Sequence, residues 1–264
     1  MKKLIGFSLT SAIIISGLGI SNTTPIYASE IQPISKFQSL REDTIKDGIG
    51  GRAFLNSTGS ILTTKVVLPE IKQNGTLKVS GDGTLFIYSG FSGKIESDIG
   101  FQYSIEHNVW KPYMKVGSRG NNQVDYLEGE LDFTYKNGFK PGSEVQLTIY
   151  KNLNGSTRAT YWGTSNKGFT GRLISEMKNT NINSVDKWKA LSTIAVPTKD
   201  KNGNPLSSTV IEESVKNIRV KDSYNTTFKD IRIDNQPINP VIHATKFANM
   251  NNNSNNITIE ITKK

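Results

Sequence analysis

Three acidic side chains at alternate positions form the clearest catalytic pattern in this sequence. Glu128, Glu130 and Asp132 lie in the run Glu-Gly-Glu-Leu-Asp-Phe, and alternate residues of a β-strand point to the same face of a sheet. Retaining hydrolysis of a glycosidic bond needs two carboxyl groups about 5–5.5 Å apart, a nucleophile and a proton donor. One hypothesis for this strand is therefore a glycoside hydrolase or polysaccharide lyase.

The same run resembles the Glu-x-Asp core of jelly-roll glucanases, which implies a nucleophile and a general acid among the three residues. It departs from that pattern because those enzymes place a further glutamate on the same face, whereas Thr134, Tyr135 and Lys136 follow here. An exposed acidic stripe is also screened by solvent and salt. Two alternatives stay open: a solvated strand face, and a face that contacts a ligand without chemistry.

A second group of residues predicts a binding face. Alternation in residues 98–106 directs one set of side chains to the core and a polar set, including Asp98 and Gln102, to the other face. The core set is Ile99, Phe101, Tyr103 and Ile105.

Aromatic residues could complete this face, because aromatic rings stack on apolar ligand surfaces while polar groups fix the ligand's orientation. The candidate ligand-binding residues are Asp98, Gln102, Trp110, Tyr113, Tyr161 and Trp162. A tryptophan in a β-sandwich also packs commonly in the core, and this alternative stays open. The first expectation is a non-enzymatic protein that binds carbohydrate or a cell-surface polymer. A structural or interaction module without a small ligand is the third hypothesis.

Oxygen ligands at Asp200, Asn202 and Asn204 could hold Ca²⁺, although the later bidentate glutamate of an EF-hand is missing. The same residues also make a good hairpin turn. The sequence has 2 His and no Cys, so we expect no other metal or cofactor and no disulfide.

The elements that must position these residues are short segments rich in β-branched and aromatic residues, separated by Gly, Asn, Asp and Pro. They predict an all-β fold, an antiparallel β-sandwich of the jelly-roll, concanavalin-like type. Residues 210–220 are predicted as a strand from their β-branched content, and residues 250–256 as an Asn-rich loop. The expected strands span 53–56, 61–68, 76–80, 84–88, 98–106, 111–116, 126–135, 144–152, 157–163, 169–176, 187–196, 210–220, 227–233 and 257–262.

The N-terminus predicts a secretory signal peptide over residues 1–28. Lys2 and Lys3 precede an apolar run, and a small-residue cleavage pattern ends at Ala28. The run is too short for a membrane span, so we expect a secreted mature chain. Residues 29–51 are interpreted as a mobile arm and residues 52–264 as a single sandwich domain, and we expect a monomer.

Residues 97–104 (Ser-Asp-Ile-Gly-Phe-Gln-Tyr-Ser) and 110–116 (Trp-Lys-Pro-Tyr-Met-Lys-Val) resemble the YrpD-like family of uncharacterised secreted proteins of Gram-positive bacteria. The resemblance implies a location and a fold but no chemistry. The whole chain has a net charge of +9, with its basic residues scattered. Scattered charge excludes a nucleic-acid stripe and favours either plain solubility or association with anionic wall polymers or polysaccharide.

Overall fold

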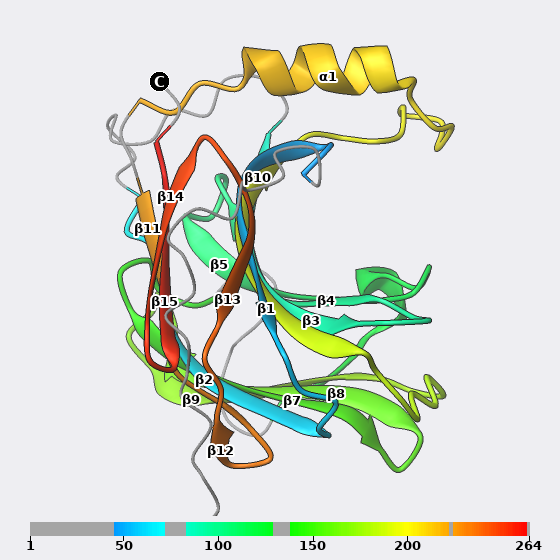
Figure 1. Ribbon diagram of the computed structural model, residues 1–264, viewed down its shortest axis with the longest axis vertical. Coiled ribbons are helices and arrows are strands. Elements are labelled where there is room, and N and C mark those ends of the chain that lie inside the picture. The colour runs from blue at the N-terminus through cyan, green and yellow to red at the C-terminus, as the bar shows by residue number, and fades with distance from the viewer. Residues whose placement is uncertain (1–44, 72–82, 129–137, 222–223, 263–264) are drawn as a thin grey trace, which may run out of the picture. The chain divides into compact units, whose positions relative to one another are not determined.

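The computed structural model describes residues 45–71, 83–128, 138–221 and 224–262, all of them within one compact unit of residues 39–264. Two antiparallel sheets pack face to face, so the predicted antiparallel β-sandwich is confirmed (Figure 1). The predicted signal peptide and most of the predicted arm lie outside the described residues.

Sheet A has six strands, which follow one another in the order β13, β1, β10, β3, β4 and β5. Their bounds are β13 (Val241–Lys246), β1 (Gly48–Leu55), β10 (Lys187–Ala195), β3 (Thr84–Ser92), β4 (Ser97–Ser104) and β5 (Val109–Val116). Strand β1 begins at Gly48 rather than at the predicted residue 53, because Gly48 already pairs with Ala195 of β10.

Sheet B follows the order β14, β15, β11, β2, β7, β8, β9 and β6, and a short strand β12 pairs with β11. Their bounds are β14 (Ala248–Asn253), β15 (Asn256–Ile261), β11 (Tyr224–Ile233), β2 (Ile61–Val67), β7 (Glu144–Leu153), β8 (Ser156–Thr164), β9 (Thr170–Met177), β6 (Asp125–Glu128) and β12 (Gln236–Pro237). A short 3-10 helix, η2 (Asn121–Gln123), precedes β6.

The core lies between the sheets and is filled by the inward residues of each alternating strand. In β4, Ile99, Phe101 and Tyr103 are buried as predicted. Ile105 is 70% exposed, so its predicted place in the core is wrong, because β4 ends at Ser104 and the chain turns there. The predicted Asn154–Gly155 turn is confirmed: both residues have positive φ, which suits a tight hairpin between β7 and β8.

Two predicted elements differ from the structure. Residues 208–217 form a helix, α1 (Ser208–Asn217), instead of a strand, because the side chain of Ser207 caps it by accepting from the Val210 amide and only Val215 within it is buried. The predicted Asn-rich loop largely forms β14, which pairs with β15 along its whole length. The predicted strand 76–80 lies outside the described residues. No helix among the described residues is long and apolar enough to cross a bilayer.

Candidate functional site

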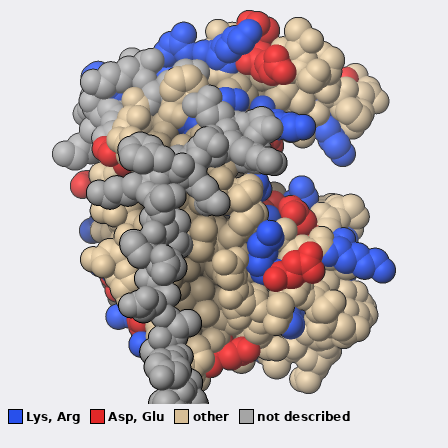
Figure 2. Space-filling model, viewed as in Figure 1, with Lys and Arg blue, Asp and Glu red and all other residues tan. Residues whose placement is uncertain are grey.

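A groove of about 390 Å³ opens on the face of sheet A that is turned away from sheet B. We call this face the open face. Side chains from β1, β3, β4, β5 and β10 line the groove, and residues 195–198 and Asp47 border it at one end. Figure 2 shows the molecule hollowed beneath α1, with basic and acidic side chains gathered at the edge of the hollow.

Three aromatic rings form the apolar part of the groove. The ring centroids of Phe86 and Tyr88 on β3 lie 5.0 Å apart, and that of Tyr113 on β5 lies 5.4 Å from Phe86 and 5.3 Å from Tyr88. Tyr88 and Tyr113 meet across β4 because Gly100 lies between them in register with both. A Cβ at Gly100 would lie 2.2 Å from the Ile87 carbonyl oxygen, so only glycine fits there.

We call Phe86, Tyr88 and Tyr113 the ring trio. Its two tyrosines are neutral phenols in this environment. Burial is the main reason why the pKa of Tyr88 is raised well above its usual range, and the nearby Asp98 adds to it. Burial and Asp98 also raise the pKa of Tyr113. The hydroxyls of Tyr88 and Tyr113 also interact by a hydrogen bond, in which either can be the donor. These phenols can exchange hydrogen bonds with a ligand, but they are poorly suited to act as bases.

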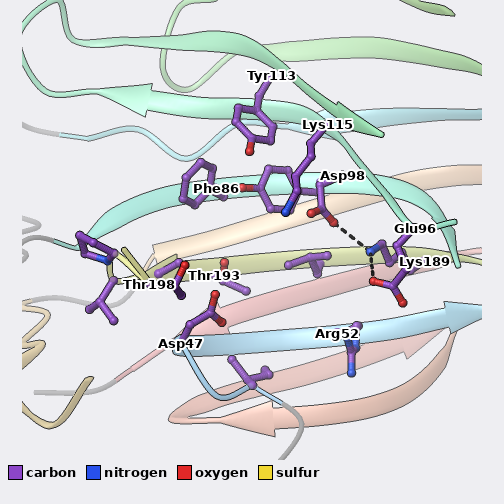
Figure 3. Close-up of a pocket in the computed structure, with 16 residues that line it drawn as sticks. Asp47, Arg52, Phe86, Glu96, Asp98, Tyr113, Lys115, Lys189, Thr193 and Thr198 are labelled. Atoms are coloured by element: carbon purple, nitrogen blue, oxygen red, sulfur yellow. Dashed lines mark ion pairs between the residues drawn. The ribbon is translucent and has the colours of Figure 1, made fainter. Parts of the chain in front are cut away.

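A charged cluster of Lys189, Asp98 and Glu96 lies beside the rings. The Lys189 side chain on β10 is only 4% exposed, and its Nζ lies 2.9 Å from Asp98 Oδ1 and 3.6 Å from Glu96 Oε2 (Figure 3). Lys189 pairs with Gly90 on β3, and because Gly90 has no side chain, the ammonium group can reach across β3 to Asp98.

The charge of Lys189 favours the ionised form of Glu96. Burial alone would raise the pKa of Glu96, but the ammonium of Lys189 and the hydroxyl of Ser92 lower it below its usual value. Glu96 therefore carries its negative charge within the cluster at physiological pH. A ligand would meet aromatic rings on one side and this polar network on the other.

A protein family and a curated relative match this chain over most of its length. The family model described as "Domain of unknown function, YrpD" matches residues 42–261. The chain belongs to the YrpD family. A relative from Bacillus subtilis (strain 168), "Uncharacterized protein YrpD", is 52% identical over 219 residues, which are 83% of either chain. The resemblance predicted from residues 97–116 is thereby confirmed.

Solved structures show a likeness of fold alone. Scytalido-glutamic peptidase with a peptide based transition state analog gives a TM-score of 0.50 at 13% identity, over 82% of this chain and 98% of that one. A second structure of that peptidase, with a transition state analog inhibitor, gives a TM-score of 0.44 at 14% identity over the same shares.

In this YrpD-family chain, half of the predicted binding residues lie on the open face. Asp98 and Tyr113 line the groove. Gln102 is half-buried on the same face of β4, where it pairs with Phe86 on one side and Lys111 on the other. Strand alternation therefore identified the polar side of β4.

The other three aromatic residues do not join them, which corrects the prediction of one shared binding face. Trp110 and Tyr161 are fully buried, and Trp110 Nε1 donates to the Pro69 carbonyl oxygen. Both fill the core, because their strand positions point between the sheets. Trp162 is 50% exposed but lies in β8 of sheet B, away from the groove.

Glu128, the one member of the acidic run that the structure describes, lies away from the groove. Glu128 ends β6, at the edge of sheet B, where its backbone pairs with Leu173. Glu130 and Asp132 lie outside the described residues. The predicted carboxylate pair therefore remains a prediction, and the groove draws its carboxylates from other elements.

The hydrogen bonds within the turn at residues 200–204 account for its Asp and Asn residues. The Asp200 carboxylate accepts from the amides of Asn202 and Asn204 and from Asn204 Nδ2, and these bonds lower the pKa of Asp200. The carboxylate closes the hairpin, as expected of a good turn sequence. No group of three acidic, histidine or cysteine side chains suited to a metal occurs in the part of the chain that the structure describes. Calcium binding here stays a prediction.

Sequence reasoning missed Phe86, Tyr88 and Lys189. A signal was present: Phe86 and Tyr88 alternate within a predicted strand, and Lys187 and Lys189 form one of the few local basic groups. What the sequence lacks is the strand pairing that brings β10 beside β3.

Proposed function

We propose that this protein is a secreted, non-enzymatic binding protein that holds a carbohydrate chain or a cell-surface polymer on the open face of sheet A. The observation that supports it is the ring trio beside an ion-paired network in one groove. Ligand sites typically combine an apolar, aromatic lining with a few fixed polar groups. Sugar rings offer both surfaces, with apolar C–H faces for stacking and hydroxyls for hydrogen bonds.

The charge state of the groove favours binding over general-acid catalysis. A catalytic acid needs a raised pKa so that it holds a proton at neutral pH. The pKa of Glu96 is lowered instead, and Asp98 forms an ion pair with Lys189. Both carboxylates are therefore suited to accept hydrogen bonds from hydroxyl groups rather than to protonate a leaving group.

The proposed secretion is supported by the N-terminal sequence. Lys2 and Lys3, the apolar run after them and the small-residue pattern ending at Ala28 are typical of a cleaved signal peptide. Intact-mass measurement of protein from culture medium tests this point. A mature chain that begins near Ser29 is expected, and retention of residues 1–28 would contradict it.

The binding proposal is tested with a panel of polysaccharides and two matched variants. Tyr113→Ala should weaken binding more than tenfold, because truncating an aromatic anchor usually costs about 2 kcal/mol or more. Trp162→Ala removes an exposed ring from sheet B and should leave affinity unchanged. Equal loss in both variants, or no binding to any polymer, would contradict the proposal.

Product release is measured in the same reactions. A pure binding protein should release neither reducing ends nor unsaturated products. Release that Glu130→Gln abolishes would instead support the glycoside hydrolase or lyase hypothesis based on Glu128, Glu130 and Asp132.

A further inference from the structure

We infer that the ligand of the open face carries acid groups, carboxylate or phosphate, and that Arg52 and Lys187 bind them at one side of the groove. This inference rests on the proposed function and narrows the chemical class of its ligand. It begins from two cations that the fold leaves without carboxylate partners.

Phe54 on β1 is the centre of this region. Lys187 Nζ lies 4.0 Å from the ring centroid of Phe54, and Arg52 Cζ lies 5.4 Å from it. The His243 ring of β13 packs against Phe54 with a centroid separation of 4.0 Å. A ring face attracts both cations, but it neutralises neither charge.

Lys189 lies two residues along β10 from Lys187, on the same face of sheet A, and provides a comparison. It is ion-paired with both Asp98 and Glu96. Among the residues that the structure describes, neither Arg52 nor Lys187 forms an ion pair with a carboxylate; their contacts are with Phe54 and His243. The fold therefore leaves both cations without a direct ion pair, although Arg52 is near enough to Glu96 to help lower its pKa.

The guanidinium of Arg52 also has a donor that is not used. Its Nη2 donates to His243 Nδ1 at 3.4 Å, whereas its Nε is buried and has no hydrogen-bond partner. Buried donors are almost always paired, so an unpaired one needs an explanation. The Arg52 side chain as a whole is half-buried, and a carboxylate or phosphate is the natural acceptor for its guanidinium, because the oxygens match the planar fork of an arginine.

The position of Arg52 suits a ligand that also reaches the rings. Strand pairing places Arg52, Leu191, Tyr88, Gly100 and Tyr113 in one row across sheet A. Arg52 and Tyr88 are thus two strands apart, about 10 Å at the usual strand spacing. Figure 3 shows Arg52 on β1, on the other side of β10 from Tyr113 and Phe86. A polymer lying across the strands could stack on the rings and present an acid group to Arg52.

The test compares three polymers by calorimetry: polygalacturonate for carboxylate, poly(glycerol phosphate) for phosphate, and an uncharged galactan. At least one acidic polymer should bind tenfold or more tightly than the galactan. The double variant Arg52→Gln/Lys187→Gln should remove that preference. Lys229→Gln is the matched control, since it removes one positive charge from sheet B and should change nothing.

The outcomes separate this inference from the proposed function. Equal affinity for acidic and uncharged polymers, unaffected by the double variant but lowered by Tyr113→Ala, would overturn the acid-group inference alone. No binding by any polymer would overturn both. If the double variant melts below the wild type, single variants replace it. Lys187→Gln should then weaken binding of the acidic polymer, and Arg52→Lys should retain it. The inference is overturned if Lys187→Gln binds the acidic polymer as the wild type does and Arg52→Lys loses that binding. Preference between the two acidic polymers identifies the acid group.

Discussion

The two outer faces of the sandwich carry ion clusters of mirrored composition in different surroundings. On the open face of sheet A one lysine, Lys189, lies between Asp98 and Glu96. On sheet B one glutamate, Glu144, lies between Lys65 at 3.9 Å and Lys229 at 3.0 Å. The distances are similar, but the central side chain is 4% exposed in the first cluster and 41% exposed in the second.

The difference teaches that burial, more than distance, decides what an ion cluster does. Exposed pairs contribute about 0–1 kcal/mol because solvent screens them. Removing one partner of a buried pair is far more costly, since a desolvated charge remains. The sheet B cluster therefore contributes little to stability, whereas the sheet A cluster holds charged groups in fixed positions inside a groove.

The largest expected effect separates the core from an exposed face. Trp110→Ala should lower the free energy of unfolding by about 3–5 kcal/mol, because it empties a fully buried position. Trp162→Ala should change it by less than about 0.5 kcal/mol. Denaturant unfolding of both variants gives these values. A small loss for Trp110→Ala would reopen its predicted role in a groove.

The next effect concerns the glycine beneath the tyrosine pair. Gly100→Ala should destabilise the fold by about 3 kcal/mol, because its Cβ would meet the backbone of β3 at 2.2 Å. Gly120→Ala is the control, since a Cβ there meets nothing closer than 3.8 Å. Thermal melting of both proteins measures the difference. Equal melting temperatures would show that the sheet can relax around Gly100.

The ion clusters themselves provide a smaller contrast. Lys189→Met should cost about 2 kcal/mol, between the exposed and buried limits, because its partners are more exposed than Lys189 itself. Lys229→Met should cost at most about 1 kcal/mol. Urea unfolding at neutral pH measures both. Equal costs would contradict the comparison between the two faces.

The smallest effect is a pH dependence. Because the folded-state pKa of Glu96 is lowered, its contribution to stability is present above pH 4.5, its ordinary pKa, and is lost as the pH falls through the folded value. The stability gap between wild type and Lys189→Met should therefore shrink below about pH 4.5. Unfolding curves between pH 3 and pH 7 would reveal it, and a gap that stays constant would argue against the Lys189–Glu96 interaction.

The sequence predicted the sandwich and one side of the groove for local reasons. Alternation in β4 separates Asp98 and Gln102 from Phe101, because side-chain direction in a strand follows directly from residue order. The residue pattern gave a wrong prediction where a helix and a strand could both produce it. The β-branched run of α1 alternates as well as a strand would, and tertiary contact through Val215 and the Ser207 cap decided the outcome.

The rest of the site depends on pairings between distant residues. Trp110 and Tyr113 differ by three positions on one strand, so they point to opposite faces, but the sequence does not reveal which face a ligand could reach. Tyr88 meets Tyr113 only because β4 lies between β3 and β5. Lys189 meets Asp98 only because β10 lies beside β3. Such neighbours require the sheet order, which residue patterns do not supply.

The place of β1 in sheet A has a consequence for how the chain folds. Arg52 pairs with Leu191 on one side and with Ala244 on the other, so the first described strand finds its partners only in the second half of the chain. Loop-closure entropy opposes such distant pairings until many contacts form together, and topologies rich in them fold slowly, on a scale of milliseconds to seconds. Sheet A can close only after its C-terminal strands are available. The groove therefore forms only after β10 has joined β1 to β3, and a chain truncated before β10 should not form it.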